Sequence, residues 1–259
     1  MTSIKQDSDI KQSNNDSTFR IIYWTGGLAS IILVAYCLIT MLIVVFIGPP
    51  PKTIEECFSI LNDNRFFGML RLDILTVFVM PLYYLLFYCI YLALKRADPE
   101  LVTISTILVF VGLTLFLATS SVFAYLNLCD QYAIATTESQ KNLLLAAGEA
   151  ILASDMWHGT SSFLGGILLH TGALLISFKM LKSSIFNKLT AYAGIFIFGL
   201  ELAHIIIGLF LPLVSAVIMV VAGTFYLFWF PSIGLRLFKL SKTAYLSYNA
   251  KVHEAPNMA

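Results

Sequence analysis

Charged residues are scarce in this sequence. They make up 12% of the 259 residues, about half of the roughly 25% that is usual for a soluble domain. Hydrophobic residues make up 58%, and a water-soluble chain this apolar would expose larger apolar patches than monomeric proteins tolerate. The composition therefore excludes an ordinary soluble domain and indicates a chain that uses lipid as its solvent.

Several motifs of common enzymes and transporters are also absent. The chain has no Walker phosphate-binding loop, no kinase loop and no G-x-S-x-G motif, so ATP-driven transport or serine-esterase activity would require another subunit. Its four cysteines form neither a C-x-x-C pair nor a zinc-ribbon spacing. The net charge of +1 gives no indication of nucleic-acid binding.

Long apolar runs are present instead. About 20 helical residues cross the hydrocarbon core of a bilayer, and six runs of the sequence are at least this long. The sequence therefore predicts an all-α fold, a polytopic membrane helix bundle with about six transmembrane helices in residues 20–238. The expected spans are about 21–47, 70–94, 101–126, 156–181, 189–211 and 213–238.

Polar segments flank and interrupt these runs. Residues 1–19 are rich in Ser, Asn, Asp, Gln and Lys and cannot bury enough apolar surface to offset the entropy of ordering, so we expect a disordered tail. Residues 239–259 are expected to form a charged, loosely ordered C-terminal tail. Between the third and fourth spans, residues 138–153 place Leu143, Leu144 and Ile151 on one helix face. This pattern predicts an amphipathic outer helix that lies on the membrane surface or caps the bundle.

Basic residues are concentrated on one side of the predicted topology. The side that holds both termini has Lys5, Lys11, Arg20, Lys95, Arg96, Lys179, Lys182, Lys188, Arg236, Lys239, Lys242 and Lys251, and the other side has Lys52, Arg65, Arg71 and Lys141. Because positive flanks stay on the cytoplasmic side, this threefold excess predicts that both termini are cytoplasmic. Cys57 and Cys129 then lie in the two outer loops, as a disulfide or as free thiols.

Ionisable side chains within the predicted spans gather in the outer half of the bundle. Each costs roughly 2.5–3.5 kcal/mol at the bilayer centre, so each requires a reason. Asp155 with His158, and Glu201 with His204, are both carboxylate-x-x-His pairs, and positions i and i+3 share a helix face. Two such pairs on neighbouring helices are similar to the metal sites of helix bundles, and four N and O ligands suit zinc or a similar divalent ion.

Two other interpretations of these pairs stay open. Each His can donate a hydrogen bond to its own carboxylate or to a neighbouring helix and so hold the bundle together, or the pairs can form a proton or substrate site. Arg71 and Asp73, at the outer end of the second span, either pair with each other or with loop groups at the interface, or Arg71 meets an anionic headgroup or a carboxylate. We expect one outward-facing ligand-binding pocket formed by Arg71, Asp73, Asp155, His158, Glu201 and His204.

Three segments carry a resemblance to a known family. They are NDNRFFGMLRLDILTVFVMPLYYLLF (62–87), AAGEAILASDMWHGT (146–160) and GLELAHIIIGLFLP (199–212). Over residues 20–212 the chain resembles a family of uncharacterised bacterial multi-pass membrane proteins, a domain of unknown function with an RLG/RLD-type second helix. The resemblance implies a location in the bacterial plasma membrane and no particular activity.

A second resemblance rests on residues 154–158. Ser154 and His158 match the S-x-x-x-H motif of the membrane hydrolases that include alkaline ceramidases and adiponectin-type receptors. The later H-x-x-x-H motif of that group is absent, because Gly208 stands four residues after His204, and the span count is one short. The likeness implies zinc-dependent hydrolysis only as an alternative.

Three functions follow from these patterns. The first is binding or transport of a small or lipophilic ligand through the outward-facing polar pocket. The second is metal-dependent hydrolysis of a lipid, and the third is an accessory structural subunit whose polar residues only specify packing. Spans one to three and four to six show no convincing internal similarity, although transporters are often built from inverted repeats. We place ligand binding or transport slightly ahead of hydrolysis.

Overall fold

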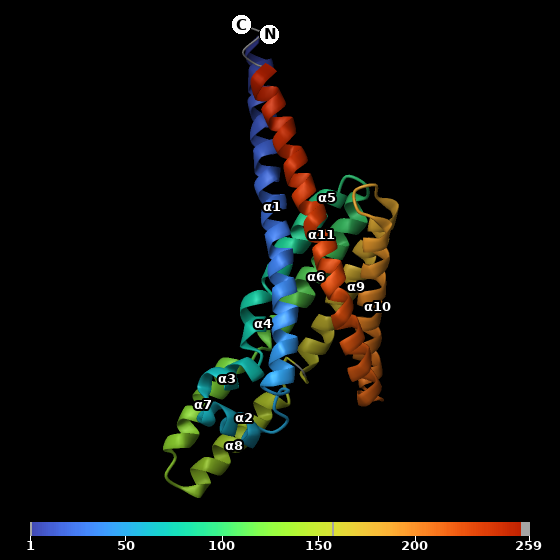
Figure 1. The fold of residues 1–259 in the computed structure, drawn as a ribbon. Helices are drawn as coiled ribbons and strands as arrows, with labels where there is room; N and C mark the ends of the chain where they lie inside the picture. The colour runs from blue at the N-terminus through green and yellow to red at the C-terminus, as the bar shows by residue number, and fades with distance from the viewer. Residues whose placement is uncertain (1, 157, 255–259) are drawn as a thin grey trace.

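Helices account for every regular element in the described part of the chain. The computed structural model describes the backbone of residues 2–156 and 158–254, and the side chains of residues 19–156 and 158–243. Its helices are α1 (Thr2–Phe46), α2 (Ile54–Asp63), α3 (Arg65–Arg71), α4 (Ile74–Val79), α5 (Leu82–Leu94), α6 (Pro99–Ala118), α7 (Val122–Ile134), α8 (Glu138–Leu152), α9 (Thr160–Lys182), α10 (Lys188–Gly208) and α11 (Pro212–Glu254) (Figure 1).

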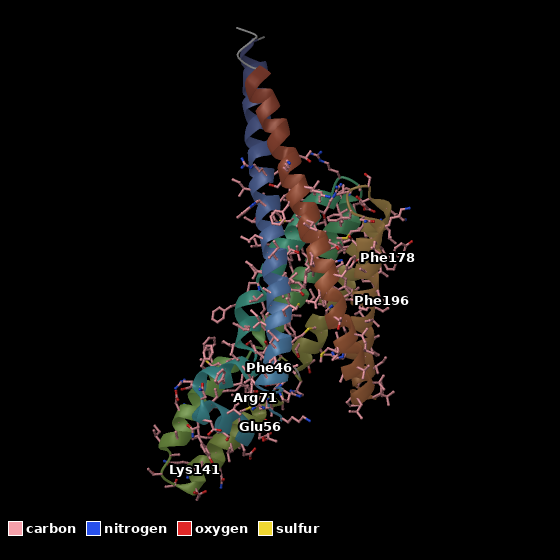
Figure 2. All side chains as sticks on the ribbon, viewed as in Figure 1. Phe46, Glu56, Arg71, Lys141, Phe178 and Phe196 are labelled. Carbon is pink, nitrogen blue, oxygen red and sulfur yellow. The ribbon has the colours of Figure 1, made fainter. Side chains whose placement is uncertain are left out.

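Six helical segments are long and apolar enough to cross a membrane, which confirms the predicted fold class. Apolar side chains such as Phe178 and Phe196 point outward from the bundle (Figure 2) and are 47% and 46% exposed, as lipid-facing residues are. The chain is therefore a multi-pass transmembrane helical protein in contact with the bilayer. The six segments are Phe19–Phe46, Ile74–Leu94, Pro99–Ile134, Thr160–Lys182, Lys188–Gly208 and Pro212–Thr243.

Two of these spans are interrupted. The second is broken between α4 and α5 at Pro81, which has no N–H to continue the helical hydrogen bonds. The third is broken between α6 and α7, where the Thr119 hydroxyl donates to the Phe116 carbonyl at 2.7 Å and the Ser121 hydroxyl donates to the Thr119 carbonyl at 3.2 Å. These hydroxyls compete with the backbone for acceptors and favour a helix end.

The two segments predicted as tails have a helical backbone in the structure. α1 begins at Thr2, within the expected disordered segment 1–19, and α11 continues to Glu254, through most of segment 239–259. Residues 1 and 255–259 lie outside the described residues. The helices continue because each added residue extends a hydrogen-bonded helix that the apolar span has already nucleated. α1 and α11 run side by side beyond the bundle (Figure 1).

Glycine residues set the spacing between α6 and α9. A Cβ atom at Gly165 would lie 2.7 Å from the Gly112 carbonyl oxygen and 3.0 Å from the Phe116 nitrogen. A Cβ at Gly172 would overlap the Ser105 carbonyl oxygen. The two backbones therefore touch, which is the packing that small residues allow in lipid.

Aromatic side chains form the centre of the bundle. Trp229 is fully buried and lies edge-on to Phe198, with ring centroids 5.2 Å apart. Phe87 and Phe230 are also fully buried and lie beside Trp229. These contacts join α5, α10 and α11 around one core.

The helices α2, α3, α7 and α8 form a separate unit, here named the cap, at the end of the bundle opposite the chain termini (Figure 1). α8 covers the segment predicted as an outer amphipathic helix, and it packs against α2 and α7. Cys57 and Cys129 lie in the cap interior as free thiols. The sequence had left open whether they form a disulfide. The buried hydrophobic cluster at the centre of the cap consists of Ile54, Cys57, Phe58, Leu61, Tyr125 and Cys129.

Candidate functional site

Four chain segments meet where the cap joins the bundle. They are residues 47–53 after α1, 72–73 between α3 and α4, 119–121 between α6 and α7, and 153–156 with 158–159 between α8 and α9. α6 has 20 residues, and at 1.5 Å per residue it extends about 30 Å, which is the thickness of the hydrocarbon core. The four segments therefore lie beside one end of a helix that is long enough to cross that core.

A cavity of about 470 Å³ lies between these segments. Its size is typical of small-molecule sites, which are mostly apolar with a few convergent polar groups. Leu72, Val122 and Met156 contribute apolar walls. The ionisable residues that line the cavity are Lys52, Cys57, Arg71, Tyr125, Asp155 and His158.

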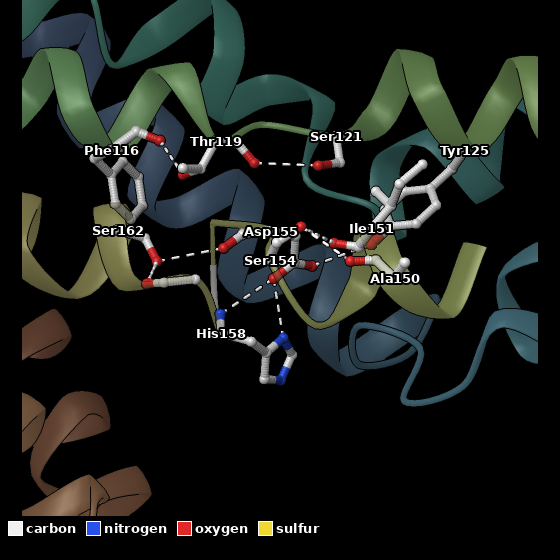
Figure 3. Close-up of polar contacts among 11 residues, drawn as sticks. Phe116, Thr119, Ser121, Tyr125, Ala150, Ile151, Ser154, Asp155, His158 and Ser162 are labelled. Atoms are coloured by element: carbon white, nitrogen blue, oxygen red, sulfur yellow. Dashed lines mark hydrogen bonds and ion pairs between the residues drawn. The ribbon is translucent and has the colours of Figure 1, made fainter. Parts of the chain in front are cut away.

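Asp155 is the polar centre of the cavity wall. The side chain is nearly buried, and its Oδ1 accepts a hydrogen bond from the His158 backbone N–H at 3.1 Å and lies 2.9 Å from His158 Nδ1. Its Oδ2 accepts a hydrogen bond from the Tyr125 hydroxyl at 3.2 Å (Figure 3). The predicted Asp155–His158 pair therefore exists, and Tyr125 of α7 fixes the carboxylate from the cap side.

The Asp155 carboxylate also orients the His158 ring. The His158 side chain is 59% exposed, and its ring projects away from the hydrogen-bonded turn (Figure 3). A carboxylate at Nδ1 fixes the tautomer and leaves Nε2 available. An imidazole held in this way can accept a proton as a base, donate to an anion when it is protonated, or ligate a metal.

Arg71 connects the cap to the segment that follows α1. Its Nε donates to the Pro49 carbonyl at 2.9 Å, and its Nη2 lies 2.7 Å from Glu56 Oε1, beside the end of α1 (Figure 2). A hydrogen bond from the Lys52 backbone N–H and the nearby Arg71 guanidinium hold the pKa of Glu56 below its ordinary value. Arg71 thus lines the cavity but pairs with Glu56 and not with Asp73.

Cys57 lies in the cavity wall as a protonated thiol. Burial raises the pKa of the Cys57 thiol to about 12. The thiolate is the nucleophilic form of cysteine, so Cys57 serves as a small apolar wall residue in this site.

Asp73, a predicted pocket residue, has a backbone role. It lies between α3 and α4 with φ of 62°, the single positive value for a non-glycine residue in the described chain. Asp and Asn tolerate this left-handed conformation better than most residues, which suits Asp73 to the sharp change of direction there. Asp73 does not line the cavity.

Glu201 and His204 lie within the bundle, away from the cavity lining. Glu201 Oε2 is 4.0 Å from His170 Nε2 of α9, and both side chains are nearly buried. The Ser215 hydroxyl of α11 lies 2.6 Å from His204 Nδ1 and 2.9 Å from the His204 carbonyl oxygen. Each residue therefore meets a partner on a facing helix, which is the bundle-stabilising interpretation.

The predicted zinc ligands are not gathered into one set. Nowhere in the described residues do three or more His, Cys, Asp or Glu side chains form a group that could hold a metal ion. Asp155 and His158 lie at the cavity, while Glu201 and His204 lie between transmembrane helices. The described geometry therefore supplies two of the four expected ligands at the cavity.

Three residues that line the cavity or contact a predicted site residue were not among the residues predicted to form the pocket. Lys52 follows three prolines in a loop, and Tyr125 lies in an apolar run, so neither has a local signal. His170 is visible as an ionisable residue within a span, but its contact with Glu201 joins helices whose relative rotation the sequence does not define. All three depend on tertiary contacts.

Comparisons with known proteins do not place the chain in a family, so only its class is identified, a multi-pass transmembrane helical protein. No protein-family model matches the chain, and no curated protein and no solved structure is significantly similar to it. The structure supports one part of the expected resemblance to multi-pass bacterial proteins, namely a bundle of six apolar helices that can cross a membrane.

Replacing Arg71 with alanine is expected to loosen the segment that follows α1. The Pro49 carbonyl and the Glu56 carboxylate both lose their guanidinium donor, and we expect the free energy of unfolding to fall by about 1–2 kcal/mol. Faster amide hydrogen exchange in residues 47–56, with unchanged exchange in α9, is the measurement.

Acidification tests the same contact without a mutation. Because the folded-state pKa of Glu56 is lowered, its pairing with Arg71 contributes fully above the ordinary Glu pKa of about 4.5 and is lost as the pH falls through the folded-state value. Exchange in residues 47–56 should therefore rise with acid in the parent protein and rise less in the Arg71→Ala variant, which keeps only the Lys52 N–H bond to Glu56. Equal responses of the two proteins would contradict this assignment.

Proposed function

We propose that the protein binds a small amphiphilic molecule with an anionic head group in the cavity between the cap and the bundle, as a membrane binding or transport protein. One observation carries the proposal: a largely apolar cavity between the cap and the bundle has Lys52, Arg71 and His158 in its wall. Such a site offers an apolar tail and a charged head separate environments.

The three cationic side chains in the cavity wall differ in how many of their hydrogen-bond donors already have partners within the protein. Arg71 uses Nε and Nη2 for Pro49 and Glu56. None of the ion pairs formed within the described residues involves Lys52, and the ring of His158 is exposed. Lys52 and His158 therefore offer the donors for an incoming carboxylate or phosphate, and Arg71 adds a fixed positive charge beside them.

The position of the cavity suits a ligand that comes from lipid. Val122 lies just after α6 of the third span, and Met156 lies just before α9 of the fourth span, so an acyl chain can follow the bundle surface. The excess of Lys and Arg on the side of both termini supports an orientation with cytoplasmic ends and a cavity on the outer leaflet. The bacterial plasma membrane is proposed only from the resemblance of residues 20–212.

Binding of a charged probe and a neutral probe tests the proposal. The probes are a fluorescent long-chain carboxylate and its methyl ester, titrated onto the protein in lipid nanodiscs. We expect Lys52→Ala and His158→Ala each to weaken carboxylate binding by about 10-fold, equivalent to about 1.4 kcal/mol for one charge-assisted hydrogen bond. Binding of the methyl ester should change little, because it lacks the charge.

Lys141→Ala is the matched control. Lys141 lies at the far end of the cap from Arg71 (Figure 2), and its contact with Glu138 is an exposed pair at 3.5 Å. This variant should bind both probes like the parent protein. Equal affinity of the parent protein for the two probes, or carboxylate binding that is insensitive to both cavity substitutions, would show the proposal to be wrong.

A second candidate function is hydrolysis of a lipid, and the Asp155–His158 geometry favours it. A buried carboxylate 2.9 Å from Nδ1 of an exposed imidazole is the arrangement that prepares His as a general base. His158→Gln should then abolish release of a labelled acyl chain from a lipid ester. Metal content of protein purified without chelator separates a metal-assisted form of this reaction from a metal-free one.

A further inference from the structure

The turn between α10 and α11 differs in composition from every segment at the cap junction. Residues 205–214 read IIIGLFLPLV and contain no polar side chain. Phe210 is 78% exposed and Leu213 is 85% exposed. In Figure 1 this turn lies apart from the cap. A turn that entered water would expose these side chains at a cost of roughly 25 cal/mol for each Å² of apolar surface.

Three backbone N–H groups of the turn have acceptors within the turn itself. The N–H of Leu209 donates to the Ile206 carbonyl at 3.3 Å, and the N–H groups of Phe210 and Leu211 donate to the Ile207 carbonyl at 3.0 and 2.8 Å. Pro212 has no N–H. Within hydrocarbon, polar backbone groups must find partners inside the protein, and the N–H groups of Leu209, Phe210 and Leu211 meet that condition.

The nearest polar side chains are also paired internally. The Ser215 hydroxyl, which is nearly buried, lies between His204 Nδ1 and the His204 carbonyl oxygen at 2.6 and 2.9 Å. This contact joins the last turn of α10 to the first turn of α11. It satisfies both side chains without water, as hydrogen bonds between helices in lipid do.

We propose that the α10–α11 turn lies among the acyl chains of the leaflet on the cap side and that its partner is lipid. The length of α10 permits this depth: 21 residues extend about 31 Å, which is close to the thickness of the hydrocarbon core, and a tilted helix of that length ends within it. The bundle therefore has a water-facing cap over some of its spans and a lipid-immersed turn at the end of the others. Lipid of that leaflet reaches the bundle directly at α10 and α11.

Spin labels at three positions test the proposal in nanodiscs. Phe210→Cys reports on the turn, Ser139→Cys on a polar, exposed position of cap helix α8, and Phe196→Cys on a lipid-facing position of α10. The unsubstituted protein gives the background from its own cysteines, three of which are buried. The accessibility of each nitroxide to oxygen, which partitions into hydrocarbon, is compared with its accessibility to a water-soluble nickel chelate.

We expect the label at 210 to resemble the label at 196, with high oxygen and low nickel accessibility, while the label at 139 shows high nickel accessibility. High nickel accessibility at 210 would place the turn in water and overturn the proposal. Low accessibility to both reagents would also overturn it, because a protein partner or a second copy of the chain would then cover the turn. Unchanged thermal unfolding of Phe210→Cys shows that the label reports on the native fold.

Discussion

Adding one methyl group at Gly112 or Gly172 is expected to destabilise the protein by about 3 kcal/mol, near the upper end of the usual cost of overpacking. A Cβ at Gly112 would overlap the Gly165 carbonyl oxygen and the Leu169 nitrogen, and a Cβ at Gly172 would overlap the Ser105 carbonyl oxygen. These neighbours are backbone atoms, so no side-chain rotation relieves the overlap. α6 and α9 must move apart over their common length, and the midpoint of thermal unfolding in detergent should fall.

Gly199 and Gly223 provide matched controls. Both lie in the interiors of transmembrane helices, and a Cβ at either position would have no neighbour within 4 Å. Because alanine is the better helix former by up to about 1 kcal/mol, Gly199→Ala and Gly223→Ala should leave the midpoint unchanged or raise it slightly. Similar effects of all four substitutions would show that helix propensity and not the contact between α6 and α9 governs the result.

The contact between α6 and α9 also positions the candidate site. α9 begins at Thr160, immediately after the turn that holds Asp155 and His158, and α6 ends at Ala118, next to the break that leads to α7 and Tyr125. A shift between the two helices therefore changes the relation of Tyr125 to Asp155. We expect variants at Gly112 to alter the cavity even where the bundle still folds.

The spans followed from the sequence because each depends on local composition. A run of about 20 apolar residues specifies a crossing by its length alone, so all six were found without knowledge of any tertiary contact. The ends of the spans were less certain. α7 continues well past the expected end at residue 126, because a helix that leaves the membrane can pack in a cap that hydropathy does not reveal.

The polar residues divide in the same way. Asp155 and His158 are three residues apart, and their pairing in the turn before α9 follows from that spacing. Glu201 and His204 have the same spacing but face different helices, because His170 and Ser215 provide partners across the bundle. Arg71 likewise pairs with Glu56, 15 residues away, and not with Asp73. Spacing predicts a contact only where no long-range partner competes.

Replacing Asp155 with alanine is expected to cost roughly 2–4 kcal/mol of stability and to release the cap from the bundle. The carboxylate accepts hydrogen bonds from the Tyr125 hydroxyl and from the His158 backbone, and it contacts the His158 ring. Tyr125 is 3% exposed, so its hydroxyl loses a partner that water cannot readily replace, and unmade buried hydrogen bonds are costly. Amide exchange should accelerate in α7 and α8 while α10 keeps its protection.

Asp130 is the matched control for this prediction. It makes a two-point contact with Arg65, at 3.0 and 2.8 Å, but both side chains are more than half exposed. Exposed ion pairs contribute about 0–1 kcal/mol, so Asp130→Ala should change stability by less than Asp155→Ala although both remove a paired carboxylate. The substitution Tyr125→Phe combined with Asp155→Ala should cost less than the sum of the two single variants, because the hydroxyl that Asp155→Ala leaves unpaired is gone. If the two effects simply add, Tyr125 does not act through Asp155, and the connection between cap and bundle resides in the apolar contacts around them.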